Sequence, residues 1–329
     1  MKVTIVGGSG FIGTSLARRL VAKAGVELNN IDLAQSRAFP DITKSGDVTR
    51  LESFENLIPE GAVVINLAAE HRDDVWPRSR YHDVNVGGAE NICTAARRRG
   101  VRHIIFTSSV AVYGFAPVGT DESGCIKPIN DYGKTKYQAE LIFRAWQAED
   151  PQNRTLVIVR PTVVFGEGNR GNVYNLMRQI SSSFFVMVGA GTNRKSIAYV
   201  ENVAAFLERA LDFTPGTYTF NFTDHPDMTM NELVDIVSTT VGRRRSRLRI
   251  PKFLGTLIGN AFDIVARITH KNFAISGIRV QKFCANSVYA SSIKDTGFVS
   301  PVPLLQALDR TVRYEFCENH ADSPTFQSE

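Results

Sequence analysis

Three polar residues have the types and spacing needed to move a proton on and off an alcohol. Tyr132 and Lys136 lie four residues apart, so both would project from one face of a helix. A cation beside a phenol favours the phenolate, and Tyr132 could then exchange a proton with a hydroxyl near neutral pH. Ser109, which ends an earlier apolar run, could hydrogen-bond the same oxygen. Tyr132, Lys136 and Ser109 are therefore the candidate catalytic residues for an alcohol-to-ketone conversion by hydride transfer.

A glycine-rich turn near the N-terminus predicts the hydride carrier. The sequence GGSGFIG at residues 7–13 follows the apolar run 3–6 and precedes a helical segment at 14–22. Such glycines allow a tight turn and a close approach of the backbone to a pyrophosphate at a helix N-terminus. Asp32 follows this turn by 19 positions, where a carboxylate would accept hydrogen bonds from a ribose and repel a 2′-phosphate. The pattern favours NAD over NADP, and a glycine-rich turn of an unrelated α/β fold is the weaker alternative.

Further small and acidic residues fit a dinucleotide. Asp47 follows a presumed third strand and could lie near the adenine, and residues 66–69 end the fourth strand with small side chains where a nicotinamide ribose must pass. Either feature alone could be ordinary turn chemistry. The NAD contacts predicted from the residues are Gly7, Gly10, Phe11, Ile12, Gly13, Asp32, Asp47, Val48, Leu67, Ala68, Ala69, Tyr132 and Lys136.

The elements that must position these residues alternate between short apolar runs and amphipathic segments. Segments such as 83–99 and 132–149 have helical length and period. The Val- and Ile-rich runs lie at residues 3–6, 28–31, 63–67, 103–107 and 156–159. The alternation predicts an α/β fold: a Rossmann-type doubly wound parallel sheet with a smaller C-terminal α/β substrate domain. We expect an NAD-binding domain at 1–170, to which elements around 195–225 return, a mainly substrate-binding domain at 171–318 and a loose tail at 319–329.

The composition is that of a globular protein. Of 329 residues, 43% are apolar and 22% charged, which excludes disorder as the main state. No run approaches the roughly 18 apolar residues of a spanning helix, and the N-terminus lacks a signal-peptide layout, so we expect a cytoplasmic protein. Four scattered cysteines without a zinc-binding spacing predict reduced thiols and no metal site. These are Cys93, Cys125, Cys284 and Cys317.

A basic cluster precedes an amphipathic segment in the last third of the chain. The net charge of +5 permits contact with phosphates, nucleic acid or an anionic membrane surface. Five arginines crowd residues 243–249, and a polar stripe runs along the otherwise apolar segment 251–268. This pattern is typical of a helix attracted to an anionic membrane, but the apolar side could equally pack in the second domain or at a dimer interface. No nucleic-acid partner is expected, since the arginines lack interleaved aromatic residues.

The motifs together resemble the extended short-chain dehydrogenase/reductase family, the NAD-dependent sugar-nucleotide epimerases and dehydratases. The resemblance covers nearly the whole chain and implies NAD contacts for Asn85 and Pro161 and a homodimer paired through two helices. Family dehydratases carry an Asp-Glu pair where this chain has Val110 and Ala111, so dehydration is disfavoured. The motifs that carry the resemblance are the glycine-rich turn, Asp32, Asn85, the Ser109 segment, Tyr132 with Lys136, Arg160-Pro161 and residues 199–203.

Shorter motifs at 69–75, 171–176, 187–193 and 279–285 resemble bacterial 4-epimerases of O-antigen synthesis, which act on N-acetylglucosamine linked to undecaprenyl diphosphate. The resemblance implies epimerisation through a transient 4-keto sugar, peripheral on the cytoplasmic face of the inner membrane. Galactose-type nucleotide-sugar epimerases usually carry lysine and asparagine where this chain has Glu70 and Thr162, which argues against a plain UDP-hexose. A soluble UDP-N-acetylhexosamine 4-epimerase, a 4-keto-sugar-nucleotide reductase and a non-catalytic dinucleotide-sensing module stay open as alternatives.

Substrate contacts are expected beside the catalytic residues and in the C-terminal half. Lys195 and Arg279 stand near positions where the family places basic residues against a diphosphate. Glu70, His71 and Arg72 follow the fourth strand, and one of them could recognise the sugar. The alternative is a loop held together by local salt bridges. The predicted substrate-binding residues are Ser108, Ser109, His71, Arg72, Asn172, Lys195 and Arg279.

Overall fold

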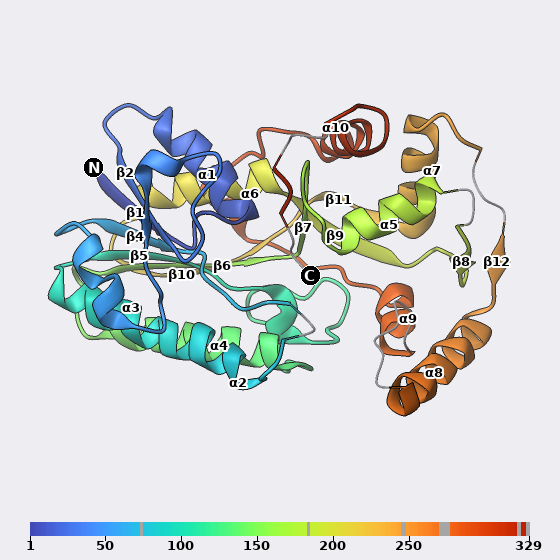
Figure 1. Ribbon diagram of the computed structural model, residues 1–329, viewed down its shortest axis with the longest axis horizontal. Helices are drawn as coiled ribbons and strands as arrows, with labels where there is room; N and C mark the ends of the chain where they lie inside the picture. Colours follow the sequence, from blue (N-terminus) through green and yellow to red (C-terminus); the bar gives the residue numbers. More distant parts are fainter. Residues whose placement is uncertain (73–74, 183–184, 245–247, 270–276, 321–323, 327–329) are drawn as a thin grey trace.

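The chain folds into two layered regions side by side (Figure 1). The computed structural model describes residues 1–72, 75–182, 185–244, 248–269, 277–320 and 324–326, without the side chains at 263–269, 278 and 279. The first region is built on a large sheet. The second, which contains the orange part of the chain, has smaller sheets with helices around them.

Within the described residues, the large sheet has seven parallel strands in the order β10-β6-β5-β4-β1-β2-β3. The predicted parallel α/β sheet is confirmed, and each predicted apolar run forms one strand. Chain order reverses between β1 and β4, and open α/β sheets bind ligands at the carboxyl ends of the strands at such a point. The strands are β1 (Lys2–Val6), β2 (Glu27–Asp32), β3 (Thr43–Ser45), β4 (Val63–Asn66), β5 (His103–Thr107), β6 (Thr155–Pro161) and β10 (Gly216–Phe222).

Helices cover both faces of the large sheet (Figure 1). Helices α1 (Phe11–Val21) and α6 (Val200–Arg209) lie on one face, and their apolar side chains join one buried core. Helices α3 (Gly88–Arg98) and α4 (Asp131–Ala148) lie on the other face and join a second core. With both faces covered, the strands can be valine- and isoleucine-rich throughout. The predicted helix at 132–149 matches α4, whereas the one at 83–99 begins with a wide π-type turn before α3.

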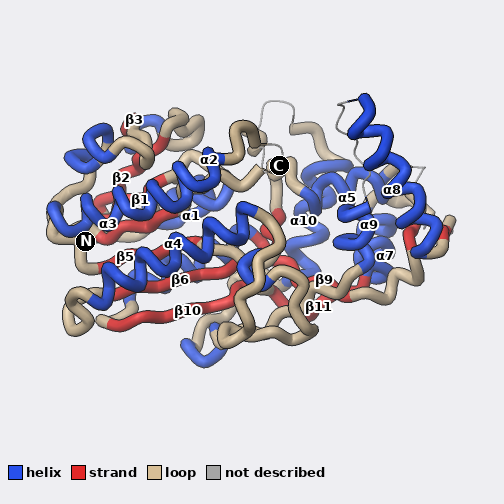
Figure 2. The backbone as a smooth tube through the Cα atoms, turned by 90° about the horizontal axis from the view of Figure 1, so that it is seen from below, coloured by secondary structure: helices blue, strands red, loops and turns tan. Residues whose placement is uncertain are grey.

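The second region is built on a small sheet in the order β11-β9-β7, with a third core between this sheet and its helices. After β9 the chain returns to the first region, because α6 packs on the large sheet and β10 is one of its strands (Figure 2). The division into domains at 1–170 with 195–225, and at 171–318, stays a prediction. The elements are β7 (Val163–Phe165), β8 (Met187–Val188), β9 (Arg194–Tyr199), β11 (Asp224–Thr229), β12 (Arg249–Ile250), α5 (Asn172–Ser181), α7 (Met230–Thr240), α8 (Lys252–Thr269), α9 (Gly277–Cys284) and α10 (Leu304–Phe316).

The C-terminal tail is tied down near the first region. The Phe326 backbone pairs with the 168–170 loop, donating from its N–H to Gly168 O at 2.9 Å and accepting from Arg170 N at 2.8 Å. Its ring centre lies 5.7 Å from that of Phe11, in the glycine-rich turn. The expectation of a loose tail at 319–329 is therefore not met at this residue, because these main-chain bonds and an aromatic contact hold it.

Candidate active site

The N-terminus of α4 positions the candidate catalytic residues. Asn130 caps the helix by accepting a hydrogen bond from Gly133 N at 2.9 Å. A Cβ at Gly133 would lie 2.4 Å from the Ala111 carbonyl oxygen, so only glycine lets α4 approach the turn after β5 this closely. This close approach brings Tyr132 from the helix to Ser109 from the end of the strand.

The side chains of Ser109 and Tyr132 lie close together. Burial raises the pKa of the phenol, and the nearby Ser109 side chain opposes that rise. The direction is opposite to the one expected from a neighbouring cation, because loss of hydration outweighs the favourable contacts of the phenolate. Without ligands, Tyr132 therefore holds its proton at neutral pH.

Lys136 is the second unusual group of α4. Its side chain is only 2% exposed, and Nζ lies 4.5 Å from the centre of the Phe106 ring. Burial lowers its pKa from 10.5 to about 7, although the charge of Glu140 one turn later opposes this. A lysine with this pKa gains or loses its proton easily under physiological conditions, which is typical of functional sites.

A buried polar network holds α4 against the large sheet. Glu140 and Arg160 form a two-pronged ion pair, with Nε to Oε1 at 2.9 Å and a terminal nitrogen to Oε2 at 2.6 Å. The Ser108 hydroxyl donates to Glu140 at 2.5 Å, and Arg160 also donates to the Tyr113 hydroxyl at 2.6 Å. The side chain of Ser108 is thus committed to this network, and its predicted role in substrate binding is not supported by this placement.

Three of the four glycines in the glycine-rich turn have different constraints. A Cβ at Gly7, whose φ is +81°, would lie 2.5 Å from Ala68 N, and one at Gly13 would lie 2.4 Å from Gly8 Cα. A Cβ at Gly10 would meet no protein atom closer than 3.8 Å. The fold therefore requires glycine at 7 and 13 but leaves space over Gly10, at the N-terminus of α1, where a pyrophosphate would fit. The residues present fit a dinucleotide.

Asp32 binds the glycine-rich turn itself. Its Oδ2 accepts from Ser9 N at 2.8 Å and its Oδ1 from Ala34 N at 3.0 Å, while Asn30 accepts from Gly8 N at 3.0 Å. The carboxylate thus ends β2 beside the turn, at the position expected of a ribose ligand. Sequence reasoning missed Asn30, although an asparagine inside a buried strand signals a specific hydrogen-bond partner.

The other predicted NAD contacts lie at or behind the carboxyl edge of the sheet. Asp47 closes a local turn by accepting from Thr49 N at 2.9 Å, and Val48 is buried beneath Gly88 of α3. Asn85 links the β4 loop to α4, because its amide donates to Glu70 O at 3.0 Å and to Thr135 Oγ1 at 2.9 Å. These three side chains have structural partners, so their direct contact with NAD stays a prediction. The remaining predicted contacts occupy the turn and strand ends: Phe11, Ile12, Leu67, Ala68, Ala69 and Pro161.

The loop after β4 contains both salt bridges and a histidine near the site. Glu70 is buried and pairs with Arg80 at 2.8 Å and Arg72 at 3.4 Å. Burial opposes ionisation of Glu70, but the two arginines together lower its pKa. Desolvation, with the charges of Lys136 and Arg72, lowers the pKa of His71, so His71 lies within electrostatic reach of Lys136. Local salt bridges explain Glu70 and Arg72, which leaves His71 as the better candidate for substrate contact.

The predicted diphosphate contacts lie where α9 meets β9. Lys195 donates from Nζ to the Lys282 carbonyl at 2.7 Å and to Ser287 Oγ at 3.3 Å. Burial lowers its pKa to about 8. Arg279 lies on α9, as Lys282 does. Its side chain is outside the described residues, so its role stays a prediction. Asn172 begins α5, away from these two residues in sequence, and its role is likewise untested.

Alanine at Gly10 should separate cofactor binding from folding. The new Cβ enters the space over the turn, so we expect purified Gly10→Ala protein to lose NAD, with a free energy of unfolding within about 1 kcal/mol of the unsubstituted protein. Gly13→Ala, whose Cβ would collide with Gly8, should instead lower the free energy of unfolding by about 1–3 kcal/mol. NAD content and urea denaturation measure both effects. Full NAD binding by Gly10→Ala would exclude this turn as the pyrophosphate site.

Comparisons with known proteins show the family of this chain. Residues 3–221 match the model of the NAD dependent epimerase/dehydratase family. The chain is 46% identical to the N-acetyl-alpha-D-glucosaminyl-diphospho-ditrans,octacis-undecaprenol 4-epimerase of Escherichia coli O157:H7, over 100% of this chain and 99% of that protein. It is 28% identical to the UDP-glucose 4-epimerase of Vibrio cholerae, over 82% of this chain and 85% of that protein.

Solved structures share the fold at low sequence identity. The UDP-glucose 4-epimerase of Thermus thermophilus, in complex with NAD, superposes with a TM-score of 0.71 at 19% identity, covering 96% of this chain and 99% of that one. MoeE5 in complex with UDP-glucuronic acid and NAD superposes with a TM-score of 0.74 at 20% identity, covering 95% and 98%.

Proposed function

Because this chain belongs to the NAD dependent epimerase/dehydratase family, we propose that it inverts C4 of N-acetylglucosamine linked to undecaprenyl diphosphate, giving the N-acetylgalactosamine form for surface polysaccharide synthesis. The observation that carries this proposal is the 46% identity over the full length of an epimerase named for that lipid-linked sugar. Tyr132, with Ser109 beside it, supplies the proton-transfer group that the reaction needs.

The proposed reaction has two opposite halves at the same carbon. Tyr132 loses its proton more readily in the presence of the positive charge of the bound cofactor, and the resulting phenolate takes the proton of the C4 hydroxyl. The Ser109 hydroxyl donates a hydrogen bond to the same sugar oxygen. Bound NAD supplies reversible hydride acceptance at C4. After the 4-keto sugar turns over, Tyr132 returns the proton to the oxygen, so no net oxidation results. Gly10 with the N-terminus of α1 would hold the pyrophosphate, and Asp32 the ribose.

The same site disfavours dehydration. Val110 and Ala111, which follow Ser109, have no side chain that could remove or donate a proton. Elimination of water from the sugar needs an acid and a base in addition to Tyr132. The chemistry available at the site is therefore hydride transfer with one proton-transfer group.

The proposed substrate also suggests where the protein acts and how it assembles. A lipid-linked sugar requires the enzyme to work at the cytoplasmic face of the inner membrane as a peripheral protein. We further propose a homodimer through α3 and α4, which lie on the outer side of the large sheet (Figure 1). Leu141 of α4 is exposed, as a side chain at such an interface would be in one separate chain.

The decisive experiment compares the two carriers. Purified protein with added NAD receives N-acetylglucosamine on undecaprenyl diphosphate in detergent or on UDP, and chromatography identifies the sugar released by mild acid. We expect conversion to N-acetylgalactosamine on the lipid carrier and at least about tenfold slower conversion on UDP. Equal or faster conversion on UDP, or none on the lipid, would overturn the proposed substrate. In a separate reaction with NADH or NADPH and a 4-keto sugar, net oxidation of the reduced cofactor would instead identify a reductase.

A further inference from the structure

Helix α8 buries its small residues and exposes its large apolar ones, the reverse of an ordinary amphipathic helix packed on a core. Its buried residues include Gly255 and Gly259, four apart on one face. A Cβ at Gly255 would lie 2.5 Å from a side-chain carbon of Val188, so the glycine face is the one that contacts β8. Helix α9 packs beside α8 as well. The protein thus covers the face of α8 that has the smallest side chains.

The large apolar side chains of α8 point to solvent. Phe253 is 69% exposed and Leu257, one turn later, is 64% exposed, with Leu254 and Ile258 also exposed beside them. Packing in the core of the second region, the alternative for this segment, is therefore wrong for these four residues. No described helix is long and apolar enough to cross a membrane. Adjacent exposed apolar side chains of this kind mark a surface that contacts another apolar phase.

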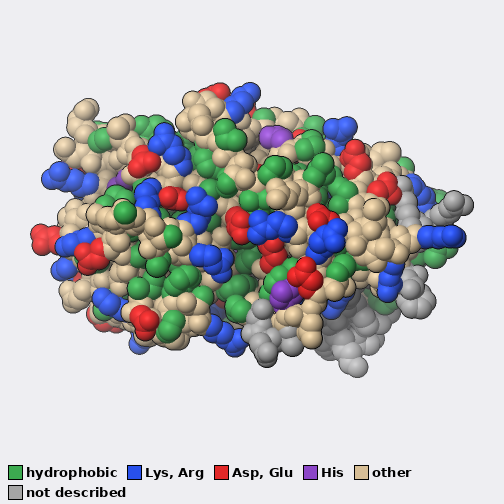
Figure 3. All heavy atoms as spheres, turned by 90° about the horizontal axis from the view of Figure 1, so that it is seen from above, with side chains coloured by type: hydrophobic (Ala, Val, Ile, Leu, Met, Phe, Trp, Pro, Cys, Tyr) green, Lys and Arg blue, Asp and Glu red, His purple; other side chains and the backbone are tan. Residues whose placement is uncertain are grey.

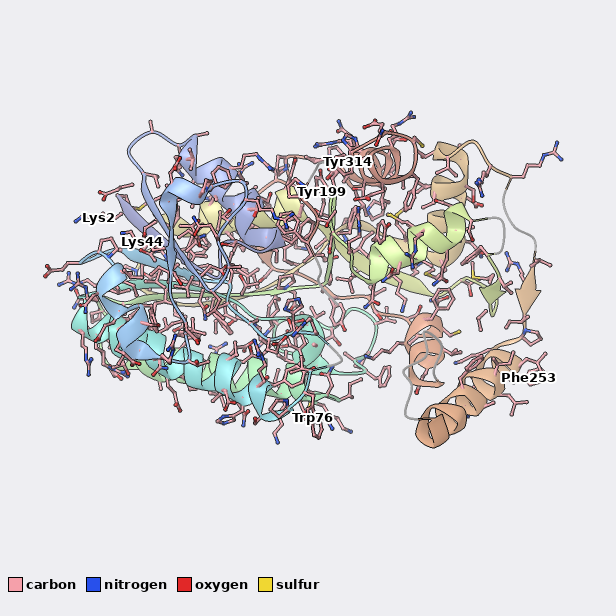
Figure 4. All side chains as sticks on the ribbon, viewed as in Figure 1. Lys2, Lys44, Trp76, Tyr199, Phe253 and Tyr314 are labelled. Atoms are coloured by element: carbon pink, nitrogen blue, oxygen red, sulfur yellow. The ribbon has the colours of Figure 1, made fainter. Side chains whose placement is uncertain are left out.

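A tryptophan is also strongly exposed. Trp76, in the loop between β4 and α2 (Ser79–His82), is 86% exposed. In Figure 4 the labelled side chain of Trp76 lies at the lower edge of the molecule and that of Phe253 at the lower right. Figure 2 looks from below and shows α2 beside the large sheet and α8 at the far end of the second region. Tryptophan and phenylalanine are the side chains that anchor proteins at the boundary between lipid headgroups and acyl chains.

Cations accompany these apolar anchors. Lys252 and Arg249 are exposed at the start of α8, and Arg243 and Arg244 are exposed before it. Arg249 donates to Ala190 O at 2.6 Å and Asn231 Oδ1 at 3.0 Å, both neutral acceptors, so its charge is not cancelled by these partners. On the face seen from above, acidic and basic side chains are intermixed (Figure 3). Exposed cations such as Lys252, next to the exposed Phe253, are complementary to an anionic bilayer.

We propose that the face formed by α8 and Trp76 docks onto the surface of an anionic phospholipid bilayer. The proposal deepens the proposed function by assigning a lipid surface as partner. Only the reason for docking, access to a lipid-linked substrate, rests on the proposed function. Trp76 follows His71 by five residues in the loop that borders Lys136, and α9 links α8 to Lys195. Docking through this face would therefore hold the catalytic region next to the headgroups, where a lipid-linked sugar diphosphate lies.

Tryptophan fluorescence and vesicle flotation test this docking directly. The chain has two tryptophans, and Trp146 is fully buried, so a spectral change on vesicle addition reports on Trp76. With vesicles of phosphatidylethanolamine and phosphatidylglycerol we expect a blue shift of the emission and flotation of the protein. The double variant Phe253→Ser/Leu257→Ser should lower the partition coefficient at least about tenfold. The matched control Val299→Ser/Leu305→Ser, at two other exposed apolar residues, should float as the unsubstituted protein does.

Other outcomes would overturn the docking surface. It fails if the protein does not float, if the α8 variant and the control lose binding equally, or if the α8 variant changes only the oligomeric mass, which would make this face an interface between copies. Flotation on neutral phosphatidylcholine as strong as on the anionic vesicles would exclude the role of the cations. Both readouts need no turnover, so they are independent of the epimerase assay in detergent.

Discussion

Replacing Tyr132 by phenylalanine should lower kcat for epimerisation by about 10²–10⁴-fold, because the ring keeps its place while the oxygen that exchanges the proton is lost. Ser109 still accepts a hydrogen bond from Ala111 N at 3.1 Å, so the turn after β5 keeps its structure. We therefore expect NAD content and the thermal midpoint to stay close to those of the unsubstituted protein. The measurement is the initial rate of sugar conversion at saturating substrate.

Tyr137→Phe is the matched control, since it removes a second phenol from the same helix. Tyr137 packs against the cluster of Val110 and Tyr113 and lies outside the proposed proton path. It should keep most of the activity. If Tyr132→Phe retained more than about a tenth of kcat, proton transfer by Tyr132 would be refuted. If only KM rose in Tyr132→Phe, the phenol would be a binding group and not a catalytic one.

Local patterns in the sequence were sufficient to predict the fold class and the glycine-rich turn. Short buried strands and intervening amphipathic helices follow from periodicity over a few residues, and every predicted run forms a strand of the large sheet. The turn at 7–13 contains four glycines, and at Gly7, Gly8 and Gly13 a Cβ would come too close to other atoms of the fold. Pattern and packing therefore agree at this turn.

Contacts between segments distant in sequence were not predictable in the same way. The pairing of Glu140 with Arg160 joins α4 to β6, and neither residue shows from its own surroundings that it has an opposite charge as partner. The available signal was a charged residue, Arg160, directly after the apolar run 156–159. The direction of the Tyr132 pKa also depends on burial, which spacing alone cannot give. For α8, periodicity identified an apolar face, but its outward orientation depends on the packing of Gly255 against Val188.

Glu140→Gln should cause a large loss of stability, about 3–5 kcal/mol in the free energy of unfolding. The side chain of Glu140 is fully buried, and it accepts from Arg160 through both oxygens and from Ser108. Glutamine keeps the shape but presents an amide donor to a guanidinium that only donates, and it leaves the charge of Arg160 unpaired. Denaturation in urea measures the effect. Glu149→Gln, which breaks the surface pairs with Arg97 and Arg154, should cost at most about 1 kcal/mol.

The apolar double variant Glu140→Leu/Arg160→Met keeps the test valid if the single variant does not fold. Removing both charges leaves no unpaired guanidinium at residue 160, so this variant should be more stable than Glu140→Gln. A double variant no more stable than the single one would show that shape, and not the buried charge, explains the loss.

The loss in Glu140→Gln should also depend on pH, because Glu140 is the charge that raises the pKa of Lys136. In the protein that pKa is about 7, below the unfolded value of 10.5, so burying Lys136 destabilises the fold by its full amount below pH 7, and this cost declines as the pH rises from 7 towards 10.5. Without Glu140 the pKa falls further and protonation costs more. The difference in unfolding free energy between variant and unsubstituted protein should therefore be larger at about pH 6 than at about pH 9. A difference independent of pH would show that Glu140 holds α4 in place without controlling the charge of Lys136.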